Sequence, residues 1–221
     1  LRVADEIGLL VWSEIPVYWT VNWDNPATLD LARRMQAETI YRDRNRAAVV
    51  LWSIGNETPV ADNRTRFHTA LAETVRALDP SRLISAALLV ERKGDTIHIA
   101  DPLLKELDVI AVNTYAGWYG DDTLADVAKL RWDVPADKPL LFSEFGADAQ
   151  AGFQDAKLRR KFSEDFQVDY YRATLAMAAT TFRVQVSLPV WRMPRWWASK
   201  RNVTPWLASP RTGRPAPPSY S

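Results

Sequence analysis

Two acidic residues follow apolar runs of this 221-residue sequence at the points where the runs end: Glu57 after "AAVVLWSIGN" and Glu144 after "KPLLFS". A carboxylate at the end of a buried strand is costly unless it has polar partners or a function. Two such carboxylates are the groups that hydrolyse a glycosidic bond with retention, because one protonates the leaving oxygen while the other attacks the anomeric carbon. That chemistry requires the carboxyl groups to lie about 5 to 5.5 Å apart.

Polar and aromatic residues accompany the acids in segments of the same kind. Asn56 directly precedes the first acid, and the segment "NTYAGWYG" follows another apolar run. Trp118 and Tyr119 in that segment are candidates for stacking on a sugar ring, with Trp19 as a further one. Asn56 and Asn113 are candidates for hydrogen bonds to sugar hydroxyls. A tyrosine such as Tyr115 could keep the attacking carboxylate ionised by donating its hydroxyl proton.

Each of these motifs also has a purely structural interpretation. An Asn-Glu pair after a strand often only caps the next helix, and a Glu before Phe-Gly is compatible with a strand that ends in a turn. Trp12 and Trp52 are expected to fill the core, and Glu14 in "WSEIP" is expected to be a structural acid or to support the site. The joint occurrence of both acids and "NTYAGWYG" is what favours an enzyme.

The elements that must position these residues are short strands that alternate with helices. Near-continuous apolar strands separated by helical segments predict a parallel sheet covered on both faces. In α/β barrels the carboxyl ends of the strands face a common mouth, so the polar residues that follow them would meet in one pocket. The five apolar runs are "IGLLVWSEIP", "AAVVLWSIGNE", "LISAALLV", "LDVIAVNTYAGWYG" and "KPLLFSEFGA".

Helical periodicity is found in three segments. Residues 25–46 begin with Asn25 as an N-cap before Pro26, residues 62–78 end before Asp79 and Pro80, and residues 157–177 form the third helix. Their predicted apolar stripes are Leu29, Met35, Ile40 and Tyr41; Phe67, Leu71, Val75 and Leu78; and Phe162, Phe166, Tyr170 and Leu175.

Composition excludes several classes of chemistry. The sequence has no cysteine and two histidines, so we expect neither disulfides nor thiolate chemistry, and no metal site or cofactor. His68 is expected on the surface of a helix and His98 in a loop or at a rim. A net charge of +1 and the lack of an apolar stretch of about 18 residues favour neither a nucleic acid nor a membrane as partner. The compartment is left open, with the cytoplasm slightly favoured.

The last part of the chain differs from the rest. After Asp169 the sequence contains no acidic residue, and residues 178–221 are rich in proline and arginine without a lasting period. We expect an irregular tail here, although "FRVQVSLPVW" could form a strand. The abrupt change suggests a shifted reading frame or a foreign join.

Four segments together resemble the catalytic barrel of glycoside hydrolase family 2, and within it the β-glucuronidase branch: "LLVWSEIPVYW", "RDRNRAAVVLWSIGNE", "DPLLKELDVIAVNTYAGWYG" and "PLLFSEFGADAQAGF". The similarity extends from about Leu1 to Met177. It implies an α/β fold that is part of a (β/α)₈ TIM barrel, about strands 3 to 7, as a domain fragment at residues 1–177.

The resemblance also implies roles for individual residues. Glu57 would be the acid/base and Glu144 the nucleophile of a retaining hydrolase that cleaves terminal β-glucuronides. Asn56 would contact the sugar 2-hydroxyl, and Tyr115 would neighbour the nucleophile. The remaining residues of the sugar site would be Asn113, Trp118 and Tyr119.

The sequence departs from the family pattern at both ends. Barrel strands one and two are not found, and neither is the late Asn-x-Lys motif with which the glucuronidase branch binds the sugar carboxylate. Action as a β-galactosidase or β-galacturonidase therefore stays open, as does a non-catalytic remnant. The expected partner is a β-glycoside substrate, and the parent enzyme could be a homo-oligomer.

Overall fold

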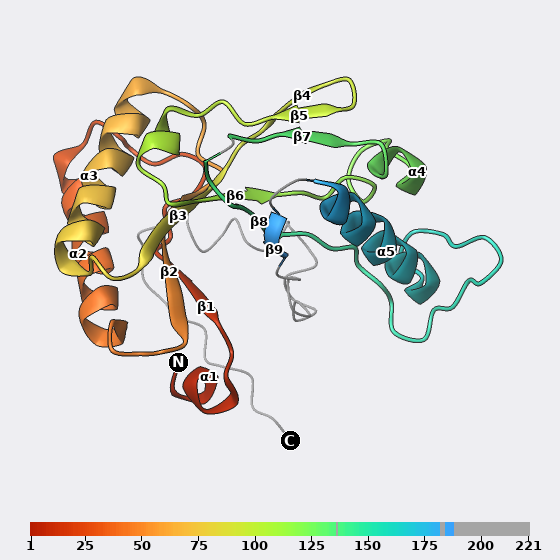
Figure 1. Cartoon of the computed structure of the whole chain (residues 1–221), viewed down its shortest axis with the longest axis horizontal. Coiled ribbons are helices and arrows are strands. Elements are labelled where there is room, and N and C mark those ends of the chain that lie inside the picture. The colour runs from red at the N-terminus through yellow and green to blue at the C-terminus, as the bar shows by residue number, and fades with distance from the viewer. Residues whose placement is uncertain (136, 182–183, 188–221) are drawn as a thin grey trace, which may run out of the picture. The chain divides into compact units, whose positions relative to one another are not determined.

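The computed structural model describes residues 1–135, 137–181 and 184–187 (Figure 1). All of them lie in one of the two units into which contacts divide the chain, Leu1–Pro189. Of the irregular tail predicted at residues 178–221, residues 178–180 belong to a helix and residues 184–187 to a strand, so the prediction is wrong there; residues 182–183 and 188–221 lie outside the described residues.

The centre of the fold is a six-stranded sheet in the order β1-β2-β3-β6-β8-β9. All neighbouring strands in it are parallel. Each of the five predicted apolar runs contributes a strand, and the candidate strand in "FRVQVSLPVW" contributes a sixth. The strands are β1 (Val11–Glu14), β2 (Val49–Asn56), β3 (Leu83–Leu88), β6 (Val109–Asn113), β8 (Leu140–Glu144) and β9 (Val184–Ser187).

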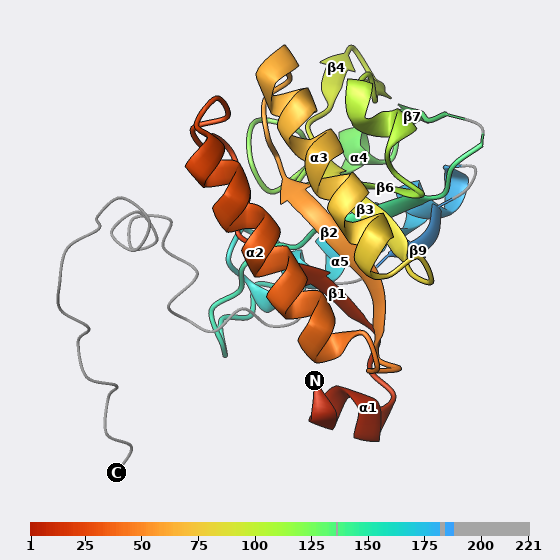
Figure 2. The ribbon, with the colours of Figure 1, turned by 90° about the vertical axis from the view of Figure 1, so that its left-hand side faces the viewer.

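Helices α2 (Pro26–Asp43) and α3 (Asp62–Leu78) lie side by side against the sheet (Figure 2). The predicted N-cap is confirmed, because Asn25 Oδ1 accepts a hydrogen bond of 3.0 Å from the Ala27 N–H. The predicted end of α3 at Leu78 is also confirmed, with Asp79 as its C-cap.

The third predicted helix is shorter than expected. Helix α5 comprises Glu164–Thr180. It begins at Glu164 because the Ser163 hydroxyl caps it by accepting a hydrogen bond of 3.1 Å from the Phe166 N–H. Phe162 has φ 74°, which ends helical geometry before the cap, so the start predicted at residue 157 is wrong. The remaining helical elements are α1 (Arg2–Ile7), the 3₁₀ helix η1 (Pro102–Lys105) and α4 (Leu124–Val127).

The main core lies between the sheet and these helices. Trp52 is fully buried in it, as predicted, and donates a bond of 2.9 Å from Nε1 to Asp79. Tyr41, Phe162 and Leu175 are exposed, so their predicted places on apolar stripes are wrong. The neighbouring Ile40 takes the buried position on α2, and two residues one position apart on a helix point about 100° apart.

The structure contains a second sheet that was not predicted from the sequence. It has three short strands. Asp133 Oδ2 in its last strand lies 3.0 Å from His98 Nδ1. His98 therefore lies in a strand rather than in the expected loop. The strands are β4 (Glu91–Lys93), β5 (Thr96–His98) and β7 (Arg131–Asp133).

The prediction that His68 lies on the surface is wrong, because its side chain is fully buried. The imidazole packs between α3 and β2, next to the rings of Trp23 and Phe67 at 5.4 and 5.7 Å. Burial lowers the pKa of His68 from 6.5 to about 4, so the folded protein holds the neutral imidazole above that pH.

This burial predicts a loss of stability in mild acid. Between pH 6.5 and about 4 the unfolded chain binds a proton at His68 that the folded chain does not, so the free energy of unfolding falls as pH falls. Over this pH range His68 lowers the free energy of unfolding by about 3 kcal/mol in total. Urea unfolding from pH 7 to 4 is expected to show a shallower decline in His68→Gln than in the unchanged chain. His98→Gln is the control, and an equal decline in all three proteins would contradict the assignment.

Candidate active site

The end of β2 turns its last residues from one face of the sheet to the other. The pairing of β2 with β3 shifts register between Ser53 and Asn56. Because of this irregularity, Ile54 packs in the core and Gly55 also faces α3, where a Cβ atom would lie 2.4 Å from His68 Nε2. Asn56 then points to the opposite face, where it lines a cavity.

Glu57 follows at once and has a left-handed backbone, with φ 48°. Such a conformation costs a non-glycine residue about 1 kcal/mol or more and persists only when its surroundings hold it. Here the Glu57 N–H donates to the Ala87 carbonyl of β3 at 2.8 Å. The Asn56 N–H donates to the Val17 carbonyl at 2.9 Å on the other side.

The second acid stands at the end of β8. Glu144 is paired with Asn113 of β6, and its Oε2 accepts a hydrogen bond of 2.7 Å from the Tyr115 hydroxyl. Burial raises the pKa of the Tyr115 phenol, and the hydrogen bond to Glu144 and the charges of Glu144 and Glu57 raise it further. The phenol therefore stays protonated as a donor, and it lies within the electrostatic reach of both acids.

A chain of side-chain hydrogen bonds connects three strand ends. Asn113 Nδ2 donates to Asn56 Oδ1 at 3.0 Å, and Asn113 Oδ1 accepts from the Ser143 hydroxyl at 2.8 Å. The first bond joins β6 to β2, although β3 lies between them in the sheet. It can form because β3 contributes only the methyl group of Ala87 to the cavity.

The cavity at these strand ends has a volume of about 230 Å³. Its lining residues are Trp12, Glu14, Asn56, Ala87, Ser143 and Glu144. Asn56 and Glu144 were assigned to the site from the sequence and Glu14 was expected to be a structural acid or to support it, whereas the other three lining residues were not predicted there. Trp12 is half-buried: it lines the cavity and also packs against a second cluster of buried apolar residues that includes Leu51 and Ala87, so its predicted place in a core is confirmed in part. The two-residue period of β1 was the available signal, because it puts Trp12 and Glu14 on one face.

Glu14 is a further carboxyl group in this cavity. Its Oε2 accepts a bond of 2.5 Å from the Ser53 hydroxyl. The side chain reaches solvent through the cavity, but protein surrounds it on its other sides, and this partial desolvation raises its pKa. The bonds from Ser53 and Trp12 oppose the increase, and the nearby charge of Glu144 adds to it.

The aromatic candidates differ in how much of their surface they present. Tyr119 is 51% exposed and its ring centroid lies 5.2 Å from that of Tyr115. Trp118 is only 8% exposed, and it packs edge-on against Phe162 at 5.0 Å. Tyr119 is thus half exposed, while Trp118 is buried behind it against Phe162. Trp19 is 59% exposed.

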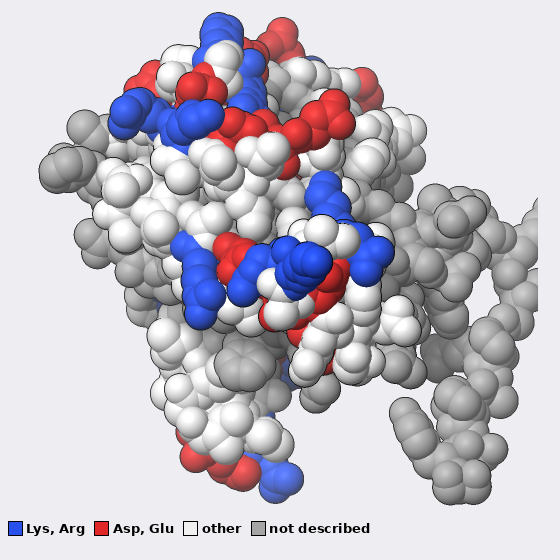
Figure 3. Space-filling view, turned by 90° about the vertical axis from the view of Figure 1, so that its right-hand side faces the viewer, with Lys and Arg blue, Asp and Glu red and all other residues white. Residues whose placement is uncertain are grey.

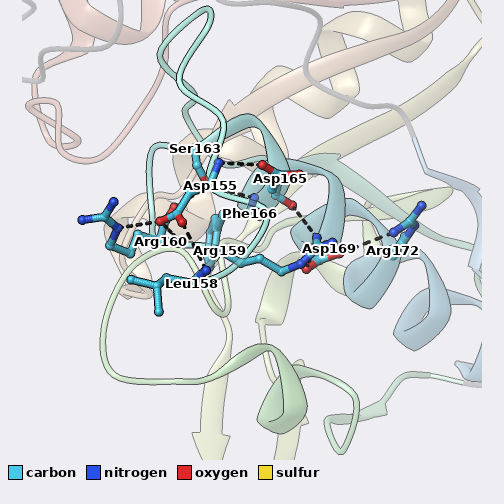
Figure 4. A network of polar contacts seen from close by, with 9 residues as sticks. All are labelled: Asp155, Leu158, Arg159, Arg160, Ser163, Asp165, Phe166, Asp169 and Arg172. Atoms are coloured by element: carbon cyan, nitrogen blue, oxygen red, sulfur yellow. Dashed lines mark hydrogen bonds and ion pairs between the residues drawn. The ribbon is translucent and has the colours of Figure 1, made fainter.

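The loop after Glu144 returns to cover Trp118. Lys161 Nζ donates to the Trp118 carbonyl at 2.7 Å. A network on the start of α5 fixes this loop (Figure 4): Asp155 accepts from Arg160 at 2.5 Å, and Asp169 accepts from Arg159 at 2.7 Å. Figure 3, viewed from the side that carries α4 and α5 in Figure 1, shows basic and acidic side chains intermixed in groups.

The structure thus places the predicted residues at one end of the sheet. Asn56 and Glu144 line the cavity, Asn113 and Tyr115 are hydrogen-bonded to them, and Glu57 acts electrostatically on Tyr115. Among the described residues no group of His, Cys, Asp and Glu could hold a metal ion. In the same part of the chain no helix is long and apolar enough to cross a membrane.

Parallel strands alternating with helices, with carboxyl, amide and phenol groups gathered at the strand ends, define a (β/α)₈-barrel protein with an acid-lined site. The sequence profile "Glycosyl hydrolases family 2, TIM barrel domain" matches residues 3–182. The chain belongs to this family, and its fold is part of the family's barrel.

The chain is similar to β-glucuronidases of animals and bacteria. The β-glucuronidase of Rattus norvegicus is 33% identical over 179 residues, which are 76% of this chain and 26% of that protein. The β-glucuronidase of Paenibacillus borealis is 31% identical over 187 residues, covering 76% of this chain and 30% of that protein. The chain therefore spans less than a third of the length of these relatives.

Solved structures show the same fold. The β-D-glucuronidase of Dictyoglomus thermophilum superposes with a TM-score of 0.70 at 27% identity, over 85% of this chain and 35% of that one. A family 2 β-galacturonidase from Eisenbergiella tayi, bound to galacturonate, gives a TM-score of 0.70 at 24% identity, over 85% and 34% of the two chains.

The Tyr115–Glu144 bond leads to a pH prediction. Tyr115→Phe removes a donor that favours the ionised form of Glu144. When the pH is lowered, a reaction that needs this carboxylate should therefore lose its activity at a higher pH in the variant than in the unchanged protein. A hydrogen bond to a charged group contributes about 1.5 to 3 kcal/mol. The acidic limb of the activity profile should therefore move to higher pH. Tyr170→Phe is the control, since that hydroxyl contacts the Gly146 N–H instead; an unmoved limb in Tyr115→Phe would contradict the assignment.

Proposed function

We propose that this chain carries the catalytic residues of a retaining β-glycosidase of the β-glucuronidase type. The observation that supports it most is the position of the Tyr115 phenol. This phenol donates a hydrogen bond of 2.7 Å to Glu144, and the charge of Glu57 contributes to its raised pKa. The phenol donates its hydrogen bond to Glu144, so the two acids have different surroundings. A nucleophile, which must be ionised, and a proton donor, which must be protonated, need such different surroundings.

In the proposed reaction Glu144 attacks the anomeric carbon while Glu57 protonates the leaving glycosidic oxygen. A covalent glycosyl-enzyme forms, and the aglycone departs as a neutral alcohol. Glu57, now a carboxylate, takes a proton from a water molecule, and that water displaces Glu144 from the sugar. The products are the free sugar, with its configuration retained, and the two carboxyl groups in their starting states.

The other polar residues bind the sugar in this proposal. Asn56 and Asn113, oriented by their mutual bond of 3.0 Å, contact ring hydroxyls, and Tyr119 offers its exposed ring surface. The names of the curated relatives favour a β-glucuronide as substrate. Paired aryl β-glucuronide and β-galacturonide assays on the longest polypeptide that contains these residues would test the choice.

Separate roles for the two acids predict different substrate dependence. Glu144→Ala should abolish turnover of every substrate because no nucleophile remains. Glu57→Ala should spare substrates with very acidic leaving groups, which need little protonation. The measurement is kcat/KM across aryl glycosides of increasing leaving-group pKa.

Glu73→Ala, which removes an exposed carboxylate of α3, is the control and should resemble the unchanged protein. An equal loss on all substrates in Glu57→Ala would refute the division of roles. Full activity in Glu144→Ala would refute the proposed nucleophile.

The open sheet predicts that the 221-residue chain alone lacks substantial glycosidase activity. Strands β1 and β9 are the two edges of the sheet, and no pairing between described residues closes it. A misplacement of about 1 Å at a catalytic group can cost about a hundredfold in rate. We expect no turnover of aryl β-glucuronides or β-galactosides by a chain that is folded by far-UV dichroism. A compact monomer that turns over either at about 10 per second would show this prediction to be wrong.

A further inference from the structure

A fully buried arginine lies directly behind the turn that carries Glu57. Arg64, in the first turn of α3, has no solvent exposure, and its Nε donates a bond of 2.7 Å to the hydroxyl of Thr58. Thr58 is the residue after Glu57 and is itself 1% exposed. The side chain of Arg64 is thus one hydrogen bond and one peptide unit away from the proposed acid/base.

The arginine is fixed from its other end. Its Nη1 forms an ion pair of 2.7 Å with Asp101 Oδ1, and both side chains are at most 1% exposed. The same Asp101 oxygen accepts a bond of 2.8 Å from the Leu103 N–H at the start of η1. The turn after β2, helix α3 and the segment leading into β6 are therefore connected through one guanidinium group.

Stability alone does not account for this arrangement. A buried ion pair loses about as much solvation as it gains in attraction, so apolar residues of similar size often stabilise a fold equally well. The pair also orients its neighbours, because the planar guanidinium donates hydrogen bonds to Thr58 and Asp101 at fixed angles. The group held in place is the turn with the strained Glu57, φ 48°.

The turn is held on its other sides as well. The Glu57 N–H is bonded to Ala87 of β3, and the Thr58 hydroxyl is bonded to Arg64. Behind it, the His68 imidazole fills the space that a side chain at Gly55 would occupy, and its Nδ1 is 2.9 Å from the Arg64 carbonyl. The tip of β2 thus cannot retreat toward α3.

We propose that Arg64, anchored by Asp101, is a positioning residue that sets the direction of the Glu57 carboxyl through the Thr58 hydroxyl. This inference rests on the proposed role of Glu57 as acid/base. Loss of the contact lets the turn relax from its left-handed conformation, which moves the carboxyl away from the leaving oxygen. Proton donation then suffers, while attack by Glu144 on the opposite part of the site does not.

The test uses Thr58→Val, which keeps the shape of the side chain and removes the acceptor, and Thr58→Ser, which restores it. In the longest polypeptide that contains these residues, kcat/KM is measured on aryl glycosides with weakly and strongly acidic leaving groups. Thr58→Val should lose tenfold or more on weakly acidic leaving groups and less than threefold on strongly acidic ones, and Thr58→Ser should recover most of the loss. Thr74→Val, which removes a hydroxyl from the middle of α3, is the matched control.

A uniform loss on all leaving groups, or no loss, would overturn the proposal, since a merely structural role has no such dependence. A crystal structure of Thr58→Val gives a second measurement that needs no turnover: the Glu57 carboxyl should move by about 1 Å or more. An unmoved carboxyl would overturn the proposal. If the longest polypeptide without substitutions hydrolyses none of these glycosides, the proposed function fails, and the displacement in the crystal still decides whether Arg64 positions Glu57.

Discussion

The reversal of direction at the tip of β2 is the constraint on which the candidate site depends. Two successive residues, Ile54 and Gly55, face α3, so the next residue, Asn56, faces the cavity. A regular strand would point alternate residues to alternate faces and would turn Asn56 toward the helix. Only a glycine fits beside the buried His68. The packing of a helix on the outer face of the sheet thereby determines which polar groups reach the inner face.

The chemistry of the site follows from unequal surroundings of similar groups. Glu14 is bonded to a serine hydroxyl, Glu144 to a phenol, and Glu57 stands on a strained turn. Carboxyl groups that share a small cavity repel one another when ionised, and each donor favours the charge on its own partner. The distribution of donors among the acids is therefore a physical basis for giving them separate roles.

Strand positions, the start of α2, the limits of α3 and the gathering of polar residues at strand ends could be predicted from sequence, because they follow from apolar runs and capping residues. The place of His68 was not predicted, although Phe67 and Leu71 are buried beside it on α3, because its burial depends on a glycine of another element. The place of Trp12 at the cavity was not predicted, because a tryptophan in an apolar run looks the same on either face of a sheet. The start of α5 was misplaced because the periodicity of residues 157–162 does not reveal the left-handed backbone of Phe162.

The bond that crosses β3 at Ala87 also fixes the polarity of the candidate site. Asn113 donates to the Asn56 oxygen, and Asn113 in turn accepts from Ser143, so neither amide can rotate without breaking a bond. Asn56 is left with its NH₂ group directed away from Asn113, as a donor that is oriented before any ligand arrives. The entropy of ordering these side chains is lost during folding and not during binding. A ligand group at this position must accept a hydrogen bond, and a group that can only donate is rejected.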